Sequence, residues 1–147
     1  MEIERKYLIQ EIPEHLPVTR TREIEQGYLN TDPVVRIRRD NERFELTCKS
    51  RGLMVREEYT IPLTREAYEH LCTKIDGQLI RKTRKEIPLT DSLTAELDIF
   101  HDQLAPLVLA EVEFPSEEEA YAFVPPDWFG RDVTFSSEYH NSTLSRR

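Results

Sequence analysis

Pairs of like charges recur at alternate positions along this 147-residue chain. The pairs are Glu2 and Glu4, Arg36 and Arg38, Lys82 and Arg84, and Glu111 and Glu113. Side chains two positions apart on a strand share a face at about 7 Å, so each pair repels by roughly 2 kcal/mol at an effective dielectric constant near 20. A solvated face gains nothing from that repulsion. The sorting by sign therefore indicates ligands, namely cations for the acidic pairs and a polyanion for the basic pairs.

Carboxylates beside a basic clamp are the parts of a phosphoryl-transfer site. Hard divalent cations prefer oxygen ligands, so an acidic cluster of this kind suits Mg²⁺ or Mn²⁺. Arginine can donate two parallel hydrogen bonds to a phosphate, while lysine acts as a point charge. Together they could stabilise charge on a transferring phosphoryl group. The alternative is that each strand simply shows its charged side to water, as antiparallel sheets often do.

The segments that carry these pairs have the two-residue period of strands, with one apolar face and one charged face. They are residues 2–6, 34–38, 44–49, 55–61, 79–87, 93–99 and 108–114, and a shorter strand is expected at 133–135. About eight antiparallel strands can close into a barrel that points alternate residues inward. We therefore predict an α+β fold, mainly antiparallel β, in which a closed eight-stranded β-barrel forms a tunnel with a charged interior.

Helices are expected to pack on the apolar outside of this barrel. Thr64 is placed to cap a helix that ends near Gly77, and Ser116 to cap a second helix that ends at Pro125. Residues 13–24 are predicted to hold one or two short helices. On the first strand, Ile3 and Tyr7 are expected to face outward with Arg5, whose side chain should extend past the helices to water. The whole chain, residues 1–147, reads as a single domain.

Composition narrows the class of protein. The chain is 38% hydrophobic and 33% charged, with a formal net charge of -8, so a nucleic-acid partner is not expected. No apolar run approaches the roughly 20 residues of a membrane-spanning helix, and the acidic start is unlike a secretory leader. We expect a cytoplasmic protein without membrane contact, in which Cys48 and Cys72 are free thiols.

The ordered motifs resemble the CYTH superfamily, the triphosphate tunnel metalloenzymes. The family's ExExK motif is present as Glu2-Ile3-Glu4-Arg5-Lys6, and VRIR, ELTCK, REEY, KTR, ELD and EVEF follow in the family's order. The resemblance spans almost the whole chain. The fold that it implies, a closed antiparallel tunnel of about eight strands, agrees with the barrel inferred from the alternating pattern.

The resemblance also implies two sets of site residues. The metal-binding set, for Mg²⁺ or Mn²⁺, is Glu2, Glu4, Asp98, Glu111 and Glu113. The triphosphate-binding set is Lys6, Arg36, Arg38, Lys49, Arg56, Lys82 and Arg84. Within these sets, Glu4, Glu113 and Lys82 are the expected catalytic residues. Glu58 and Glu96 are expected to hold the binding side chains in place.

The short chain and its EIERKYL start look most like bacterial inorganic triphosphatases, which predicts divalent-metal-dependent hydrolysis of inorganic tripolyphosphate. The alternatives are hydrolysis of thiamine triphosphate or of a nucleoside triphosphate, cyclisation of ATP, and triphosphate binding without turnover. A small-molecule triphosphate is the expected partner, and the sequence leaves open whether the protein is a monomer or a homodimer. It also leaves open the role of Tyr28 and whether residues 138–147 close one end of the tunnel.

Overall fold

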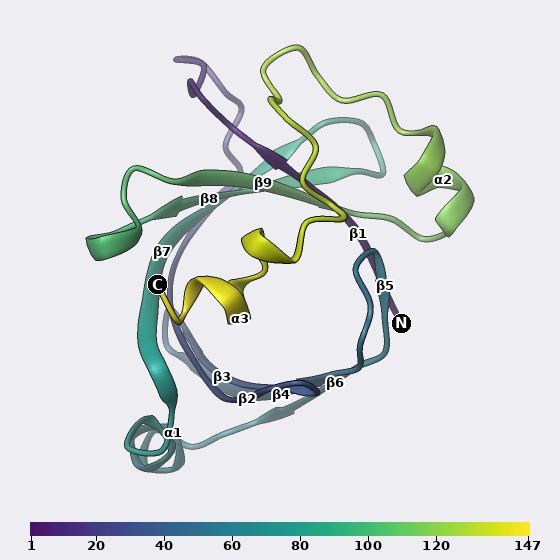
Figure 1. Ribbon diagram of the computed structural model, residues 1–147. Helices are drawn as coiled ribbons and strands as arrows, with labels where there is room; N and C mark the ends of the chain where they lie inside the picture. The colour runs from purple at the N-terminus through teal and green to yellow at the C-terminus, as the bar shows by residue number, and fades with distance from the viewer.

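One antiparallel sheet wraps around to form a barrel in the computed structural model, which describes residues 1–147 (Figure 1). The strands are β1 (Glu2–Leu8), β2 (Arg20–Thr31), β3 (Val34–Asp40), β4 (Arg43–Lys49), β5 (Val55–Arg56), β6 (Glu58–Pro62), β7 (Asp76–Pro88), β8 (Thr94–Phe100) and β9 (Val108–Glu113). Their order in the sheet is β5-β1-β9-β8-β7-β2-β3-β4-β6. The first and last strands of that order are separated in the chain only by Glu57, so the barrel is nearly closed.

Residues 13–24 contain no helix, contrary to prediction, because residues 13–19 form a turn and irregular chain and β2 begins at Arg20. This strand is 12 residues long and pairs with both β3 and β7, which makes it a central part of the wall. Its outer face begins with Thr21, Glu23 and Glu25, so the strand has polar residues on both faces over its first half. The alternation of apolar and polar residues that marks a strand is therefore absent there.

Residues 133–135 do not form a strand, contrary to prediction. Asp132 makes a single bridge to Tyr7, and the segment then runs along the edge of β1, where the Val133 amide donates to the Lys6 carbonyl at 2.8 Å. The Thr134 hydroxyl accepts from the Lys6 amide at 3.0 Å. The segment thus satisfies backbone groups of β1 that β5 is too short to reach. Nine strands result in place of eight, because the strand at 133–135 is lost, β2 is added and the 55–61 segment is divided at Glu57.

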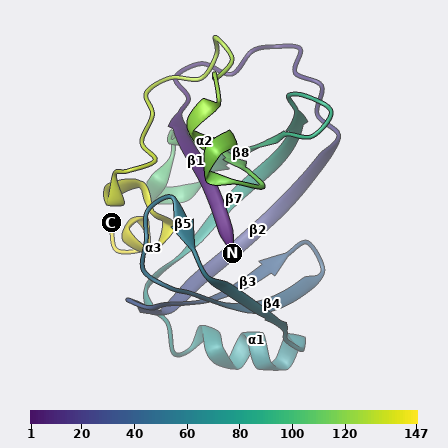
Figure 2. The ribbon, with the colours of Figure 1, turned by 90° about the vertical axis from the view of Figure 1, so that its right-hand side faces the viewer.

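Two helices lie on the outside of the barrel and one on the inside. Helix α1 (Arg65–Cys72) packs near β3 and β4, and α2 (Glu117–Ala122) packs beside β1 (Figure 2). The predicted caps are confirmed, since the Thr64 hydroxyl accepts from the Ala67 amide and the Ser116 hydroxyl from the Glu119 amide. The first helix ends before the predicted Gly77, which belongs to β7. Single turns of 3₁₀ helix occur at Asp102–Leu104 and Ser137–Tyr139.

Helix α3 (Asn141–Leu144) lies within the ring of strands (Figure 1). Leu144 is fully buried in a cluster of apolar residues drawn from several strands. The other buried members of this cluster are Tyr28, Val34, Ile80, Phe100, Leu104, Leu109 and Val133. One end of the barrel interior is therefore filled by apolar packing around the C-terminal segment, and only the remainder is charged. No helix of the structure has both the length and the apolar character needed to cross a membrane.

The outer face of β1 packs as predicted except at Arg5. Ile3 and Tyr7 are buried in a second apolar cluster with residues of β8, β9 and the segment that follows them. The Arg5 guanidinium does not reach past the helices to water. It donates to the Ala120 carbonyl at 2.8 Å and pairs with Asp132 at 2.6 Å. Arg5 thus satisfies a free carbonyl in the last turn of α2, which holds that helix on the barrel.

A buried ion pair joins β2 to β3 at the end of the barrel opposite α3. Arg22 donates through two nitrogens to Asp40, at 3.1 and 2.7 Å, and Asp40 is only 2% exposed. Burial alone would raise the pKa of Asp40, but its hydrogen bonds and ion pair with Arg22, together with the charges of Arg38 and Arg43, hold that pKa below its usual value. A depressed carboxyl pKa stabilises the fold at neutral pH, and the contribution is lost as the pH falls through it.

We expect D40N to lower the free energy of unfolding at pH 7 by about 2 kcal/mol, because Arg22 loses its two charge-assisted hydrogen bonds to Asp40 and keeps only its ion pairs with the more exposed Glu86 and Glu96, at 3.1 and 3.4 Å. The difference from wild type should shrink as the pH falls below about 4, where Asp40 becomes protonated in the unfolded chain. Urea unfolding at several pH values measures both effects. The control is D102N, which breaks an exposed pair with Arg81 and should change stability little. An equal effect of the two substitutions would contradict the account.

Candidate triphosphate site

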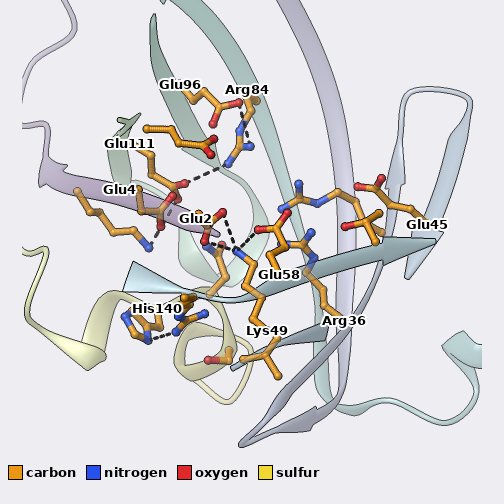
Figure 3. A pocket seen from close by; sticks show the side chains of 18 of the residues that line it. Glu2, Glu4, Arg36, Glu45, Lys49, Glu58, Arg84, Glu96, Glu111 and His140 are labelled. Carbon is orange, nitrogen blue, oxygen red and sulfur yellow. Dashed lines mark hydrogen bonds and ion pairs between the residues drawn. The ribbon is translucent and has the colours of Figure 1, made fainter. Parts of the chain in front are cut away.

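The charged part of the barrel interior encloses a cavity of about 250 Å³. Twenty residues line it and only two of them are hydrophobic. Figure 3 shows their side chains converging from strands on all sides of the barrel. The lining includes most of the residues predicted from the sequence: Glu2, Glu4, Lys6, Arg36, Arg38, Lys49, Arg56, Arg84, Glu111 and Glu113. Glu58 and Glu96, the acids expected to hold the binding side chains, line it as well, together with Glu45.

The acidic side of the cavity is built by three neighbouring strands, β1, β9 and β8. Glu4 lies opposite Glu113 in the β1–β9 register, and Glu111 lies opposite both Lys6 of β1 and Glu96 of β8. Because side chains opposite each other in adjacent strands share a face, this register gathers the carboxylates on one wall. Glu113 stands at the exposed mouth and Glu111 is deeper, at 6% exposure.

Two carboxylates on this wall, Glu4 and the exposed Glu113, have no ion pair, and Glu4 is the less exposed of the two. Glu111 forms ion pairs with Lys6 and with Arg84, each at 3.6 Å, and these cations hold its pKa well below the usual value despite burial. Glu4 has no ion pair of its own. Burial, followed by the charges of Glu111 and Glu2, raises the pKa of Glu4 to about 8. A cation bound next to Glu4 would therefore reduce the electrostatic cost of ionising this buried carboxylate.

The basic side is built by β3 and β4 and has the opposite imbalance. Arg38 donates to Gln26 at 2.8 Å, a neutral partner. Burial, then the charges of Arg36 and Arg84, lowers the pKa of Arg38 to about 9, although a guanidinium remains charged at neutral pH. Arg36 donates from Nη2 to the Thr47 hydroxyl at 3.2 Å, while its buried Nε has no partner. Buried polar groups are normally paired, so this free donor indicates a place for an anion.

Lys49 and Arg56 connect the two walls near the point where the barrel closes. The Lys49 ammonium lies 2.9 Å from Glu2 and 3.5 Å from Glu58. Burial raises the pKa of Glu2, and the charge of Lys49 opposes that rise. Arg56 lies opposite Glu2 in the β1–β5 register and contacts the His140 ring at 3.0 Å. Glu58 thus pairs with Lys49, a member of the predicted triphosphate-binding set.

Lys82 and Asp98 are not among the residues that line the cavity. Both are 0% exposed and they pair at 2.7 Å. Asp98 also accepts two hydrogen bonds from Arg84, at 2.7 and 2.8 Å, so both carboxylate oxygens have cationic partners. Burial, partly opposed by Asp98, lowers the pKa of Lys82 to about 7. Of the predicted site residues, these two form a supporting layer behind Arg84.

Some lining residues were not predicted from the sequence. Arg22 reaches the cavity from β2, which was not predicted because its outer face is also polar. The sequence does hold a signal for this strand, since Arg22, Gln26 and Tyr28 stand at alternate positions and so share one face. Tyr28, whose role the sequence left open, lines the cavity and also belongs to the apolar cluster around Leu144. His140, Asn141 and Ser142 enter from the C-terminal segment, which does lie at one end of the tunnel.

The donor set fits a hard divalent cation. No group of three or more His, Cys, Asp or Glu side chains is gathered closely enough to hold a metal ion as the side chains now stand. The carboxylates nevertheless share one cavity, and Glu4 carries the uncompensated acidity that a cation would relieve. Oxygen donors without histidine or cysteine favour Mg²⁺ or Mn²⁺ over zinc.

Comparisons with known proteins place this chain in a family. A family model described as the CYTH domain matches residues 1–146. A curated inorganic triphosphatase of Nitrosomonas europaea is 40% identical over 148 residues, which cover 98% of this chain and 96% of the relative. An inorganic triphosphatase of Acetivibrio thermocellus is 39% identical over 126 residues, covering 81% and 77%. The crystal structure of inorganic triphosphatase NE1496 matches with a TM-score of 0.73 at 38% identity, covering 100% of this chain and 95% of that one.

We expect E4Q to stabilise the protein in the presence of a chelator. With a folded pKa near 8 and an unfolded pKa near 4.3, Glu4 binds more protons in the folded state, so wild-type stability falls as the pH rises between those values. The gain from E4Q should grow over the same range, by about 1.4 kcal/mol per pH unit at most. Thermal unfolding across this pH range is the measurement. E113Q, at the exposed mouth, should gain less, and an E4Q protein less stable than wild type would contradict the charge assignment.

Proposed function

We propose a function for this chain from one premise: the chain belongs to the CYTH domain family. It hydrolyses inorganic triphosphate to diphosphate and phosphate inside the barrel, in the presence of a divalent metal ion. The relatives named inorganic triphosphatase support this proposal. The observation that carries it is the imbalance of the two walls, where Glu4 lacks a cation and Arg36 and Arg38 lack an anion within one cavity.

The size and lining of the cavity favour a substrate without an organic group. At about 250 Å³ the cavity lies below the roughly 300–1,000 Å³ of typical sites for drug-sized ligands, which are mainly apolar. Only two lining residues here are hydrophobic, so an adenine or thiamine ring would have little apolar surface to stack on. These features argue against the nucleotide and thiamine alternatives and for a bare phosphate chain.

The metal ion is proposed to be Mg²⁺ or Mn²⁺, held by Glu4 together with Glu2, Glu111 and Glu113. A bound divalent ion would polarise phosphoryl oxygens and neutralise the charge that develops during transfer. Asp98 was expected in this set, but both of its oxygens are engaged by Arg84 and Lys82. We assign it instead to hold those two side chains.

The basic side chains are proposed to bind and orient the phosphate chain. Arg36 and Arg38 lie on one strand and can direct free guanidinium donors to neighbouring phosphoryl groups. Lys6, Lys49, Arg56 and Arg84 add positive charge around them. Cations fixed before the substrate arrives stabilise the transition state without reorganising during the reaction. Lys82, being fully buried, is proposed to position Arg84 and Asp98 rather than to touch substrate.

In the proposed reaction, a water molecule attacks a terminal phosphorus atom. The bond from that phosphorus to its bridging oxygen breaks, diphosphate leaves with the electron pair, and the attacking water gives up its proton. Glu4 and Glu113 are the proposed catalytic carboxylates. Both have raised pKa values because burial and neighbouring carboxylates disfavour their charge, so both would be stabilised by a divalent ion. Their proposed catalytic role is to hold that ion, which would make the attacking water more acidic, and the proton is released to solvent. A cytoplasmic location and a small-molecule partner remain parts of the proposal.

The proposal is tested by phosphate release from tripolyphosphate, pyrophosphate, ATP and thiamine triphosphate with Mg²⁺ or Mn²⁺, monitored also for cyclic AMP. We expect fast, metal-dependent release from tripolyphosphate and slow release from the others. E4Q should lower the rate at least about a hundredfold, since it removes a carboxylate from the site, while the protein stays folded. Binding of tripolyphosphate without turnover would favour the binding-module alternative, and a cyclic product would contradict the proposal.

A further inference from the structure

The C-terminal segment separates the charged cavity of the barrel from a second cavity, which is open to solvent at the turn between β2 and β3 and the loop after β4. His140, Asn141 and Ser142 line the main cavity (Figure 3, His140 labelled). The second cavity, of about 380 Å³, lies on the other side of the segment, against Thr31 and Ser50. The two cavities share four lining residues, which are Val34, Arg56, His140 and Ser142. His140 and Ser142 are thus the part of the C-terminal segment that stands between them.

This partition is firmly held. Leu144 is 0% exposed in the inner apolar cluster, and the Ser145 carbonyl accepts from the Gln78 amide of β7 at 2.9 Å. Gly77 has a positive φ of 69°, and a Cβ added there would lie 2.5 Å from the Ser145 carbonyl oxygen. The close approach of the segment to β7 therefore depends on glycine at this position. The segment lies inside the barrel and is anchored to its wall by this hydrogen bond and by the burial of Leu144.

Three consecutive residues of the segment accept hydrogen bonds from basic side chains of the barrel interior. The Lys6 ammonium donates to the Tyr139 carbonyl at 3.2 Å, and the Lys82 ammonium donates to the Asn141 side chain at 3.2 Å. Between these residues, Arg56 lies 3.0 Å from His140 Nδ1. Burial, then the charges of Lys6 and Arg56, lowers the pKa of His140 to about 4, so the ring is neutral and Nδ1 can accept from Arg56.

We propose that His140 is the end stop of the substrate cavity and determines how many phosphoryl groups of a linear polyphosphate fit. This inference rests on the proposed function. A phosphate chain lying along Arg36 and Arg38 can extend toward the C-terminal segment only as far as the imidazole ring. Beyond the ring lies the second cavity, which is open to solvent, and the imidazole ring with its hydrogen bond from Arg56 stands between it and the charged cavity. The acidic and basic walls thus recognise the charge of the substrate, and His140 limits the length of the phosphate chain that fits between them.

The test compares tripolyphosphate with tetrapolyphosphate in wild type, H140A and H140Q. H140A joins the two cavities, so we expect the ratio of kcat/KM for tetrapolyphosphate to that for tripolyphosphate to rise about tenfold, a typical selectivity for a steric limit in a pocket. H140Q keeps the bulk and can still accept from Arg56, so its ratio should stay near that of wild type. The matched control is H15A, whose histidine is exposed far from the site and whose activity should be unchanged.

Calorimetric titration of the two polyphosphates in the absence of metal gives a second measurement, and the same change in relative affinity is expected. If H140A does not fold, H140N takes its place, since it is shorter but keeps an acceptor oxygen. An unchanged ratio in a folded H140A or H140N protein, with both substrates affected equally, would overturn the end-stop role. Absence of tripolyphosphate hydrolysis in wild type would instead reject the proposed function on which the inference rests.

Discussion

A continuous chain of buried ion pairs makes the charged interior of this barrel possible. Lys82 pairs with Asp98, Asp98 with Arg84, Arg84 with Glu111 and Glu111 with Lys6, so that opposite charges alternate across β7, β8, β9 and β1. Each of these side chains is nearly or fully buried. Burying an unpaired charge is strongly destabilising, whereas a fully paired network is tolerated. The rest of the interior depends on this network, because several charged side chains outside it have no ion-pair partner in the protein and need a ligand to balance their charge.

Charge that the network leaves unbalanced lies on its two sides. Glu4 projects beyond the network on the acidic wall, and Arg36 and Arg38 project toward the cavity from β3. A polyanion with its metal ion would balance both sides at once, which neither a cation nor an anion alone would do. Stability and function are opposed here, since the groups proposed to bind substrate are those whose charge the folded chain compensates least.

Much of this architecture can be predicted from alternation. In seven segments the apolar face and the charged face are separated, and the like-charged pairs indicate which face needs a ligand. Strand β2 could not be predicted in this way because Thr21, Glu23 and Glu25 make its outer face polar as well. The supporting role of Lys82 and Asp98 could not be predicted from the sequence either. Their depth relative to Arg84 is set by the register of β7 and β8, and a single strand's pattern carries no information about register.

The sequence contains a signal that the C-terminal segment closes one end of the tunnel, but it can be interpreted only once the structure is known. Three charged faces continue into an apolar residue in the same alternation: Val34 precedes Arg36, Ile80 precedes Lys82, and Leu109 precedes Glu111. These residues form the cluster that receives Leu144. In a barrel whose interior held only water and charged groups, inward-facing apolar residues would be exposed to water and would add no stability. Their presence shows that the interior has an apolar end as well as a charged cavity.

The central claim is that the acidic and basic walls bind the metal and the phosphate chain respectively, in one cavity. A crystal structure with Mn²⁺ and a non-hydrolysable imido analogue of tripolyphosphate tests it most directly, because the anomalous signal of manganese locates the metal independently of the anion. The account predicts manganese beside the Glu4 carboxylate, with the phosphoryl groups against Arg36 and Arg38. Manganese outside the barrel, or an anion bound away from these two arginines, would contradict it.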